Sequence, residues 1–319
     1  APCRYGCRLD TAEVQGAWTA LAHQACARRI LLLAESVVAA DNYQALRYLL
    51  AATRPDGWQW EASTYYHTFV LRAAVLALRA VPAAPPPAAV RDRLAGMAGV
   101  LATLRTSGGL LPALHDGPYA RQGFVDELTD LEEAVDGSPA PPEEIHVFAD
   151  AGYAVVRGHG IHAIVDFGPH GGSHGHRDKL ALYLYGAGTA WNPDPGQVPY
   201  GHAGWRRYYA GTAAHPAYSV DGEEQAECGG RLVEVTDRSI TVACDDAYPG
   251  VPARRRLTLG DTGLLDELSV DCDRPRRITS QLRPAVALDA ITTGMDWTAY
   301  DTTTATFRSE YRTTSRTEN

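Results

Sequence analysis

Residues 147–167 read VFADAGYAVVRGHGIHAIVDF, two apolar runs separated by a glycine-rich piece. Branched and aromatic residues dominate both runs, and short runs bounded by glycines are typical of β-strands. Residues 147–157 and 161–167 are therefore predicted strands. No helical stretch separates the further short runs, which lie at 180–185, 217–220, 232–235, 239–243, 254–259 and 263–270. Strands at this spacing favour an antiparallel β-sandwich.

Upstream of the proline-rich segment 138–142, the pattern changes to that of helices. Residues 61–80, EASTYYHTFVLRAAVLALRA, place apolar residues three and four apart, as an amphipathic helix does. Similar spacing predicts further helices at 12–27, 45–52 and 90–106. We therefore expect an α+β chain of two domains, which are a helical domain over residues 1–140 and an antiparallel β-sheet domain over residues 141–319.

Composition limits the classes of function. The 319 residues carry 29 basic and 38 acidic side chains, a net charge of −9. General nucleic-acid binding needs a broad basic surface, so this charge argues against it. Every apolar run is shorter than the roughly 18 residues of a membrane span, so no transmembrane helix is expected. The first residue is not methionine, no signal peptide is visible, and six cysteines lack zinc-finger spacing. A secreted, periplasmic or cytoplasmic location, the disulfide state and the oligomeric state all stay open.

Seven of the eleven histidines lie between His159 and His215. His174 and His176 are two residues apart at the predicted start of a strand, where positions two apart face the same side. Asp194 lies between two prolines in a predicted tight turn. Together with His215, these residues offer the imidazole and carboxylate groups that bind zinc. The alternative is that they are polar residues of surface turns.

Four segments of the sequence resemble those of the heparinase II/III-like family of polysaccharide lyases. They are EASTYYH at 61–67, GGSHGHRDKL at 171–180, DPG at 194–196 with YG at 200–201, and TAAH at 212–215 with VDG at 220–222. The second segment is the most specific, and the order and separation of all four resemble those of the family. The resemblance extends over residues 12–235.

This resemblance implies a partial α/α toroid of helical hairpins, followed by an antiparallel β-sandwich. It also implies an enzyme that cleaves uronate-containing acidic polysaccharides by β-elimination. The implied cofactor is Zn²⁺, a mainly structural ion whose ligands match His176, Asp194 and His215.

The same matching implies the catalytic residues. β-Elimination beside a uronate carboxylate needs a group that neutralises the carboxylate, a base and an acid. Tyr66 matches the tyrosine that supplies the acid and the base, His174 a histidine of the catalytic cleft, and Tyr200 a second cleft tyrosine. A tyrosine serves as a base only when positive charge lowers its pKa from about 10.

Two features depart from the family pattern. Members carry an Asn-His pair well before the catalytic tyrosine, whereas residues 8–11 here read RLDT. The chain also begins partway through the expected toroid. An arginine could replace the missing asparagine, because a guanidinium binds a carboxylate with two hydrogen bonds. The candidate substrate-binding residues are Arg206, Arg207, Trp205 and His67, with Arg8 as a further candidate.

Three functions remain open from the sequence. They are a zinc-containing lyase for an acidic glycan, an eliminase for a small uronate-like metabolite, and a non-catalytic glycan-binding or scaffold protein. A contact between Tyr66 and His174 across the two domains would favour an enzyme. A hydrolase with paired carboxylates is less well supported, because the acidic pairs at 143–144 and 223–224 have the context of solvated turns. Lys179, the single lysine, is expected to form a structural ion pair with Asp178.

Overall fold

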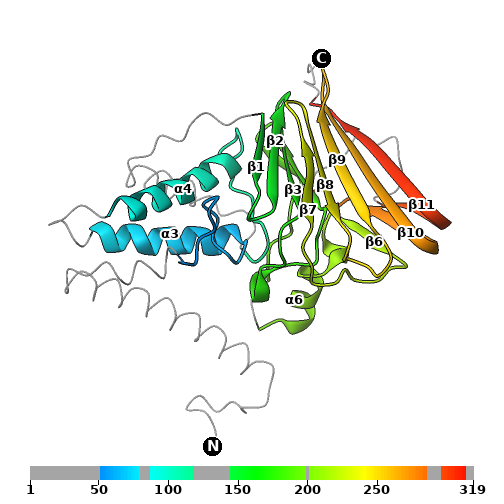
Figure 1. Ribbon diagram of the computed structural model, residues 1–319, viewed down its shortest axis with the longest axis horizontal. Helices are drawn as coiled ribbons and strands as arrows, with labels where there is room; N and C mark the ends of the chain where they lie inside the picture. Colours follow the sequence, from blue (N-terminus) through cyan, green and yellow to red (C-terminus); the bar gives the residue numbers. More distant parts are fainter. Residues whose placement is uncertain (1–50, 80–86, 118–143, 199–200, 286–295, 314–319) are drawn as a thin grey trace, which may run out of the picture.

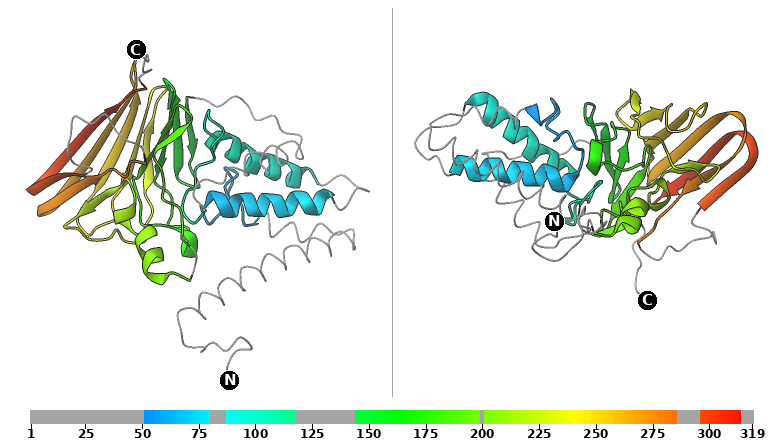
Figure 2. Two further views of the ribbon diagram at one scale, coloured as in Figure 1. Left: turned by 180° about the vertical axis from the view of Figure 1, so that it is seen from behind. Right: turned by 90° about the horizontal axis from the view of Figure 1, so that it is seen from below.

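The computed structural model describes residues 51–79, 87–117, 144–198, 201–285 and 296–313. This part of the chain forms three layers, which are a pair of helices, a five-stranded sheet and a six-stranded sheet (Figure 1). Views from behind and from below show the five-stranded sheet in the middle (Figure 2). The predicted helix at 12–27, most of the one at 45–52 and the predicted domain boundary at 140 lie outside the described residues.

The five-stranded sheet is an antiparallel meander in which each strand pairs with the next. Its strands are β1 Ile145–Phe148, β2 Tyr153–Gly158, β3 Ile161–Asp166, β4 Leu182–Gly186 and β5 Thr189–Asn192. The single strand predicted at 147–157 is a hairpin, so that prediction was wrong. Gly152 permits the turn, because its φ is +76° and a Cβ there would lie 2.0 Å from the Cα of Gly168. Strand β5 is not among the predicted strands.

The six-stranded sheet has the order β11-β10-β9-β8-β7, and β6 also pairs with β10. Its strands are β6 Tyr218–Val220, β7 Arg231–Val235, β8 Ser239–Cys244, β9 Ala253–Leu259, β10 Leu264–Gln281 and β11 Asp296–Tyr311. Five predicted runs coincide with β6 to β10, but β10 extends well beyond the predicted 263–270. Strand β11 is rich in threonine, and almost all of its described side chains are exposed or half-buried, so its apolar pattern is weak and pairing with β10 defines it.

The five-stranded sheet is buried on both faces. Val156 and Val165 belong to the core shared with the six-stranded sheet, whereas Val155 and Ile164 pack toward the helices and Trp58. All six residues of β3 are buried. Burial of both faces explains why β2 and β3 are almost continuous apolar runs, rather than alternating apolar and polar residues.

The helical layer consists of α3 Thr64–Arg79 and α4 Ala88–Leu104, which pack together as a hairpin. Leu71 of α3 and Met97 of α4 belong to a core of their own. The described residues contain this hairpin but do not show the expected toroid. No helix in the described ranges has both the length and the apolar character that crossing a bilayer demands.

His67 lies inside the helical layer and is fully buried. Its Nδ1 accepts the backbone N–H of Gln59 at 3.1 Å, and its Nε2 donates to the carbonyl of Met97 at 2.9 Å. The predicted contact of His67 with substrate is therefore wrong, because both ring nitrogens hold α3 to neighbouring segments. Burial lowers the pKa of His67 to about 4, so the ring is neutral at pH 7.

A buried ion pair connects β9 and β10 to the five-stranded sheet. The side chains of Arg255 and Asp266 are 2% and 5% exposed. Nε and Nη2 of Arg255 bond the two carboxylate oxygens at 2.7 and 2.6 Å. Its Nη1 donates to the carbonyl of Leu180, just before β4, at 2.6 Å. The guanidinium therefore links the two sheets.

We expect His67 to make the fold sensitive to acid. An unfolded histidine titrates near pH 6.5, whereas folded His67 takes up a proton only near pH 4, so the unfolded state binds more protons between these values. This group should lower the free energy of unfolding by about 2 kcal/mol from pH 7 to pH 5. Urea unfolding of the wild type and His67→Gln measures the effect. The variant should depend less on pH, and an equal pH dependence would contradict the prediction.

Removal of one partner of the buried ion pair should destabilise the fold strongly. Arg255→Met leaves the Asp266 carboxylate buried and uncompensated, and we expect a loss of about 3–5 kcal/mol in unfolding free energy. The matched control is Arg308→Met, whose ion pair with Glu267 of β10 has side chains that are 76% and 40% exposed. The control should lose about 1 kcal/mol or less. Similar losses in chemical denaturation would show that burial is not what makes the first pair important.

Candidate active site and metal centre

Apart from His67, the predicted site residues in the described ranges lie where loops of the five-stranded sheet meet the start of α3. One loop, residues 167–181, joins β3 to β4 and contains the short helical turn η2 Gly172–His174. Another, residues 193–217, joins β5 to β6 and contains α6 Ala203–Tyr209 and η3 Thr212–Ala214. Helix α6 lies at the lower end of this sheet (Figure 1).

Tyr66 and His174 form a stacked pair between the helical layer and the sheet. Their ring centroids are 3.8 Å apart, and the ring planes differ by 15°. Tyr66 comes from the first turn of α3, and His174 is the last residue of η2. Nδ1 of His174 lies 2.9 Å from Oε1 of Glu61, which holds the ring in place. The contact that would favour an enzyme is therefore present.

His174 and His176 do not share the face of a strand, so this prediction was wrong. Both residues precede β4, and the intervening Gly175 packs so closely that a Cβ would lie 1.5 Å from the carbonyl oxygen of His170. His174 contacts Glu61, whereas His176 contacts residues of the interior. The two histidines therefore belong to two different parts of the site.

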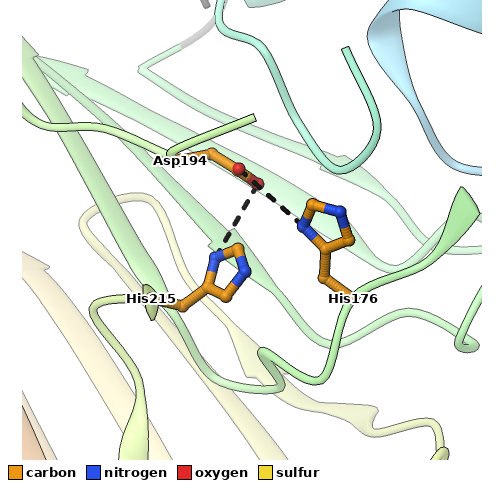
Figure 3. Close-up of side chains that lie close together, drawn as sticks. All are labelled: His176, Asp194 and His215. Carbon is orange, nitrogen blue, oxygen red and sulfur yellow. Dashed lines mark ion pairs between the residues drawn. The ribbon is translucent and has the colours of Figure 1, made fainter. Parts of the chain in front are cut away.

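His176, Asp194 and His215 come together as one buried cluster (Figure 3). One possible ligand atom from each residue lies within 4.8 Å of the others. Oδ1 of Asp194 is 3.9 Å from Nδ1 of His176, and its Oδ2 is 4.0 Å from Nδ1 of His215. These separations are too long for hydrogen bonds. They suit ligands that share one ion, because zinc lies about 2.0–2.2 Å from nitrogen and oxygen ligands.

The outer nitrogen of each of these imidazoles is anchored on an oxygen atom. Nε2 of His176 donates to Oδ1 of Asp116 at 3.2 Å, and Nε2 of His215 donates to the carbonyl of Tyr209 at 2.9 Å. Each Nδ1 then presents a lone pair to the cluster. Nδ1 of His176 has no hydrogen-bond partner among the described residues, and the Tyr183 hydroxyl lies 3.2 Å from Nδ1 of His215. Metal-binding histidines are usually anchored in this way.

Burial determines the protonation of the cluster. Burial lowers the pKa of His176 and lowers that of His215 to about 3, so both rings are neutral at pH 7. Burial and the nearby Asp178 carboxylate raise the pKa of Asp194 well above its usual range. A divalent cation requires neutral imidazoles and would favour the ionised form of this carboxyl group. The three residues therefore fit a metal ion.

A second buried cluster lies beside the first and contains its own cations. The ammonium of Lys179 donates to Asp166 and lies 3.4 Å from Oδ1 of Asp178, so the predicted Lys179–Asp178 pair is confirmed. Nε2 of His115 lies 3.2 Å from Asp166 and 3.4 Å from Asp178. Burial opposes a charge on His115, but the carboxylates of Asp178 and Asp166 outweigh it and raise its pKa to about 10. Two positive groups thus balance two carboxylates, and a metal ion is not needed here.

Helix α6 carries three of the predicted substrate-binding residues. Trp205 is 63% exposed, and Arg207 is exposed as well. Arg206 differs, because its Nη1 and Nη2 bond the carboxylate oxygens of Asp116 at 3.0 and 2.5 Å. Its Nη2 also donates to the carbonyl of Ser173 at 3.1 Å. These donors are engaged within the protein, and direct contact of the three residues with substrate stays a prediction.

Tyr200 and Arg8 lie outside the described residues. Conversely, Glu61, His115 and Asp116 hold positions in the site that sequence reasoning missed. The available signal was the pair His115-Asp116, two adjacent ionisable residues in an otherwise apolar loop. Nothing in the sequence indicates that this loop lies against residues 174–176, because that contact exists only in the folded chain.

Solved structures with the same fold include three lyases or heparinases. A heparinase III-BT4657 gene product aligns at TM-score 0.71 and 16% identity, over 83% of this chain and 48% of its own. The heparan sulfate lyase HepC from Pedobacter heparinus aligns at TM-score 0.64 and 15% identity, over 75% of this chain and 42% of its own. A heparinase III structure aligns at TM-score 0.64 and 17% identity, over 77% and 45%. The chain thus spans less than half the length of each.

Comparison with curated proteins gives no sequence match. A sequence-family profile described as "Heparinase II/III-like, C-terminal" matches residues 140–319. This segment contains every strand of both sheets and His174. It also contains His176, Asp194 and His215, which we call the metal-type cluster. Because the match covers more than half of the 319 residues, the chain belongs to the heparinase II/III-like family.

Proposed function

We propose that the protein is a lyase that cleaves a uronate-containing acidic glycan by β-elimination. The observation that carries this proposal is the stacked pair of Tyr66 and His174, which brings a phenol and an imidazole from separate layers to 3.8 Å between centroids. Family membership and the fold shared with heparinases support the same reaction.

The reaction makes definite demands on the site. A base removes the proton from C5 of the uronate, and the electron pair forms the C4–C5 double bond. The bond from C4 to the glycosidic oxygen breaks, and an acid protonates that oxygen. The C5 proton is acidic enough only when the neighbouring carboxylate is neutralised. The site must therefore supply a proton acceptor, a proton donor and a group for the carboxylate.

In this proposal, the Tyr66 hydroxyl exchanges protons with the sugar. An imidazolium beside a phenol favours the phenolate electrostatically, and His174 is the imidazole in contact with it. Glu61 bonds Nδ1 of His174 and orients that ring toward Tyr66. Oε2 of Glu61 is in turn bonded by the side chain of Gln59 at 3.0 Å, so the carboxylate is itself held in place. These four residues form a continuous chain of contacts.

The metal belongs to the proposal as a structural element. His176, Asp194 and His215 would hold one zinc ion through two Nδ1 atoms and a carboxylate oxygen. The ion would supply a cross-link between the β3–β4 loop and the β5–β6 loop. Since His174 lies two residues from His176, a fixed β3–β4 loop would also fix His174 beside Tyr66.

The first prediction concerns Tyr66. Tyr66→Phe removes the hydroxyl and keeps the ring, and we expect kcat to fall by about 10²–10⁴-fold, as for loss of a general acid or base. Tyr65→Phe is the matched control, because it removes a hydroxyl from the adjacent residue of α3 and should keep its activity. The assay follows the ultraviolet absorbance of the unsaturated product on a panel of uronate polymers and oligomers.

An active, unchanged Tyr66→Phe protein would contradict the role of Tyr66. Product formation on small uronates but not on polymers would favour an eliminase for a small metabolite. Folded, zinc-loaded wild type that is inactive on the whole panel would contradict the lyase and favour a glycan-binding or scaffold protein.

The second prediction concerns the metal. We expect the wild type to contain one zinc ion per chain, measured by plasma mass spectrometry, and His176→Ala to lose it because one of three ligands is gone. His170→Ala is the control, because His170 lies in the same loop but near Glu227, outside the cluster. Wild type that binds no zinc while this loop stays ordered would contradict the assignment.

A further inference from the structure

Asp116 contacts four residues from three separate segments of the structure at once. Its side chain bonds His176 of the β3–β4 loop and Arg206 of α6. Its backbone bonds His174 and Ser63, the residue before α3. Asp116 is 1% exposed, so these contacts are shielded from water. The loop that carries Asp116 is therefore a junction between the metal-type cluster and the Tyr66–His174 pair.

The side chain of Asp116 acts on the metal-type cluster. Its Oδ1 accepts hydrogen bonds from Nε2 of His176 at 3.2 Å and Nη1 of Arg206 at 3.0 Å. These two hydrogen bonds hold the Asp116 carboxylate against the outer nitrogen of His176. An ionised carboxylate on the outer nitrogen orients an imidazole ligand and makes it a better electron donor.

The backbone of Asp116 acts on the other half of the site. Its N–H donates to the carbonyl of His174 at 3.2 Å, and its carbonyl accepts the hydroxyl of Ser63 at 2.5 Å. The Ser63 oxygen also accepts the backbone N–H of Tyr66 at 3.3 Å, which is the bond of a helix N-cap. The first turn of α3 and the backbone of His174 are thus held by one residue.

We propose that Asp116 is a positioning residue that couples the metal centre to the Tyr66–His174 pair. A bound ion fixes His176, the hydrogen bond from His176 fixes Asp116, and the backbone of Asp116 fixes both partners of the stacked pair. The inference rests on the proposed function, because it takes this pair as the reacting groups. Asp116 is not itself a ligand of that ion, since it bonds Nε2 of His176 while Nδ1 faces Asp194.

The first test measures zinc affinity of the full chain by competition with a coloured chelator. Asp116→Asn keeps the shape of the side chain and removes its charge, and we expect zinc to bind about 10–100-fold more weakly. Asp56→Asn is the matched control, because Asp56 bonds the backbone N–H groups of Ala151 and Trp58 instead of a cluster residue. Unchanged affinity in Asp116→Asn would overturn the proposal.

The second test follows the coupling without any substrate. In protein labelled with ¹⁵N-histidine, Zn²⁺ alone should shift the ring signals of His174, which are assigned by their loss in His174→Gln. In Asp116→Asn at saturating zinc, most of that shift should disappear, whereas Asp56→Asn should keep it. An equal zinc-induced shift in Asp116→Asn would overturn the proposal, because the signal would then travel by another path.

The third test is a cycle of metal removal and mutation in the lyase assay. Removal of zinc should change kcat by a larger factor than KM. The fall in kcat should be larger in the wild type than in Asp116→Asn. A purely structural role would give equal factors.

If Asp116→Asn does not fold, Arg206→Gln removes the contact from α6 and keeps Asp116 in place, and a smaller loss of zinc affinity and of the His174 shift is expected. No loss in that variant would overturn the proposal.

The tests separate the two proposals. If the wild type has no lyase activity but the zinc-induced shift of His174 depends on Asp116, the proposed function fails and the coupling stands. If the wild type is an active lyase and the shift is independent of Asp116, the function stands and the coupling fails.

Discussion

The burial of both faces of the five-stranded sheet is the constraint on which the rest of the structure depends. Strand β3 is buried along its whole length, so charged groups lie at its end, where Asp166 meets Asp178 and Lys179. Buried charges are tolerated only when they are paired. Lys179 and His115 supply the positive charges that neutralise these carboxylates. This buried ionic cluster lies beneath the candidate site.

Short contacts connect this buried ionic cluster to the other residues of the candidate site. The backbone N–H of His115 donates to Asp194 at 2.9 Å, and the hydroxyl of Tyr183 donates to Asp178 and lies 3.2 Å from Nδ1 of His215. Asp116, the residue after His115, bonds Ser63 before α3 and Arg206 of α6. The contacts of His115 and Asp116 join segments far apart in the sequence, so the geometry of the Tyr66–His174 pair depends on correct packing of helices on the sheet.

A net charge of −9 repels a polyanion at long range, so the proposed lyase would have to recognise an acidic glycan through local groups. Arg206 bonds both carboxylate oxygens of Asp116, so its guanidinium is already engaged. Arg207 and Trp205 on the same short helix are exposed, so under the proposed function they would offer a cation to a carboxylate and an aromatic face to a sugar ring. On α6, Arg206 is bonded to Asp116, whereas the neighbouring Arg207 faces solvent.

The sequence by itself determined the order of helices before strands, most strand positions, and the identity of the residues that converge at His176, Asp194 and His215. These features depend on local patterns of apolar residues and on short motifs. Tertiary structure alone decided that 147–157 is a hairpin, that β11 is a strand, that His67 is buried and that His174 and His176 face different parts of the site. It also decided the roles of Glu61, His115 and Asp116. The physical reason is that burial, hydrogen bonding and charge pairing depend on which distant segments come together, and no local pattern of residues encodes those partners.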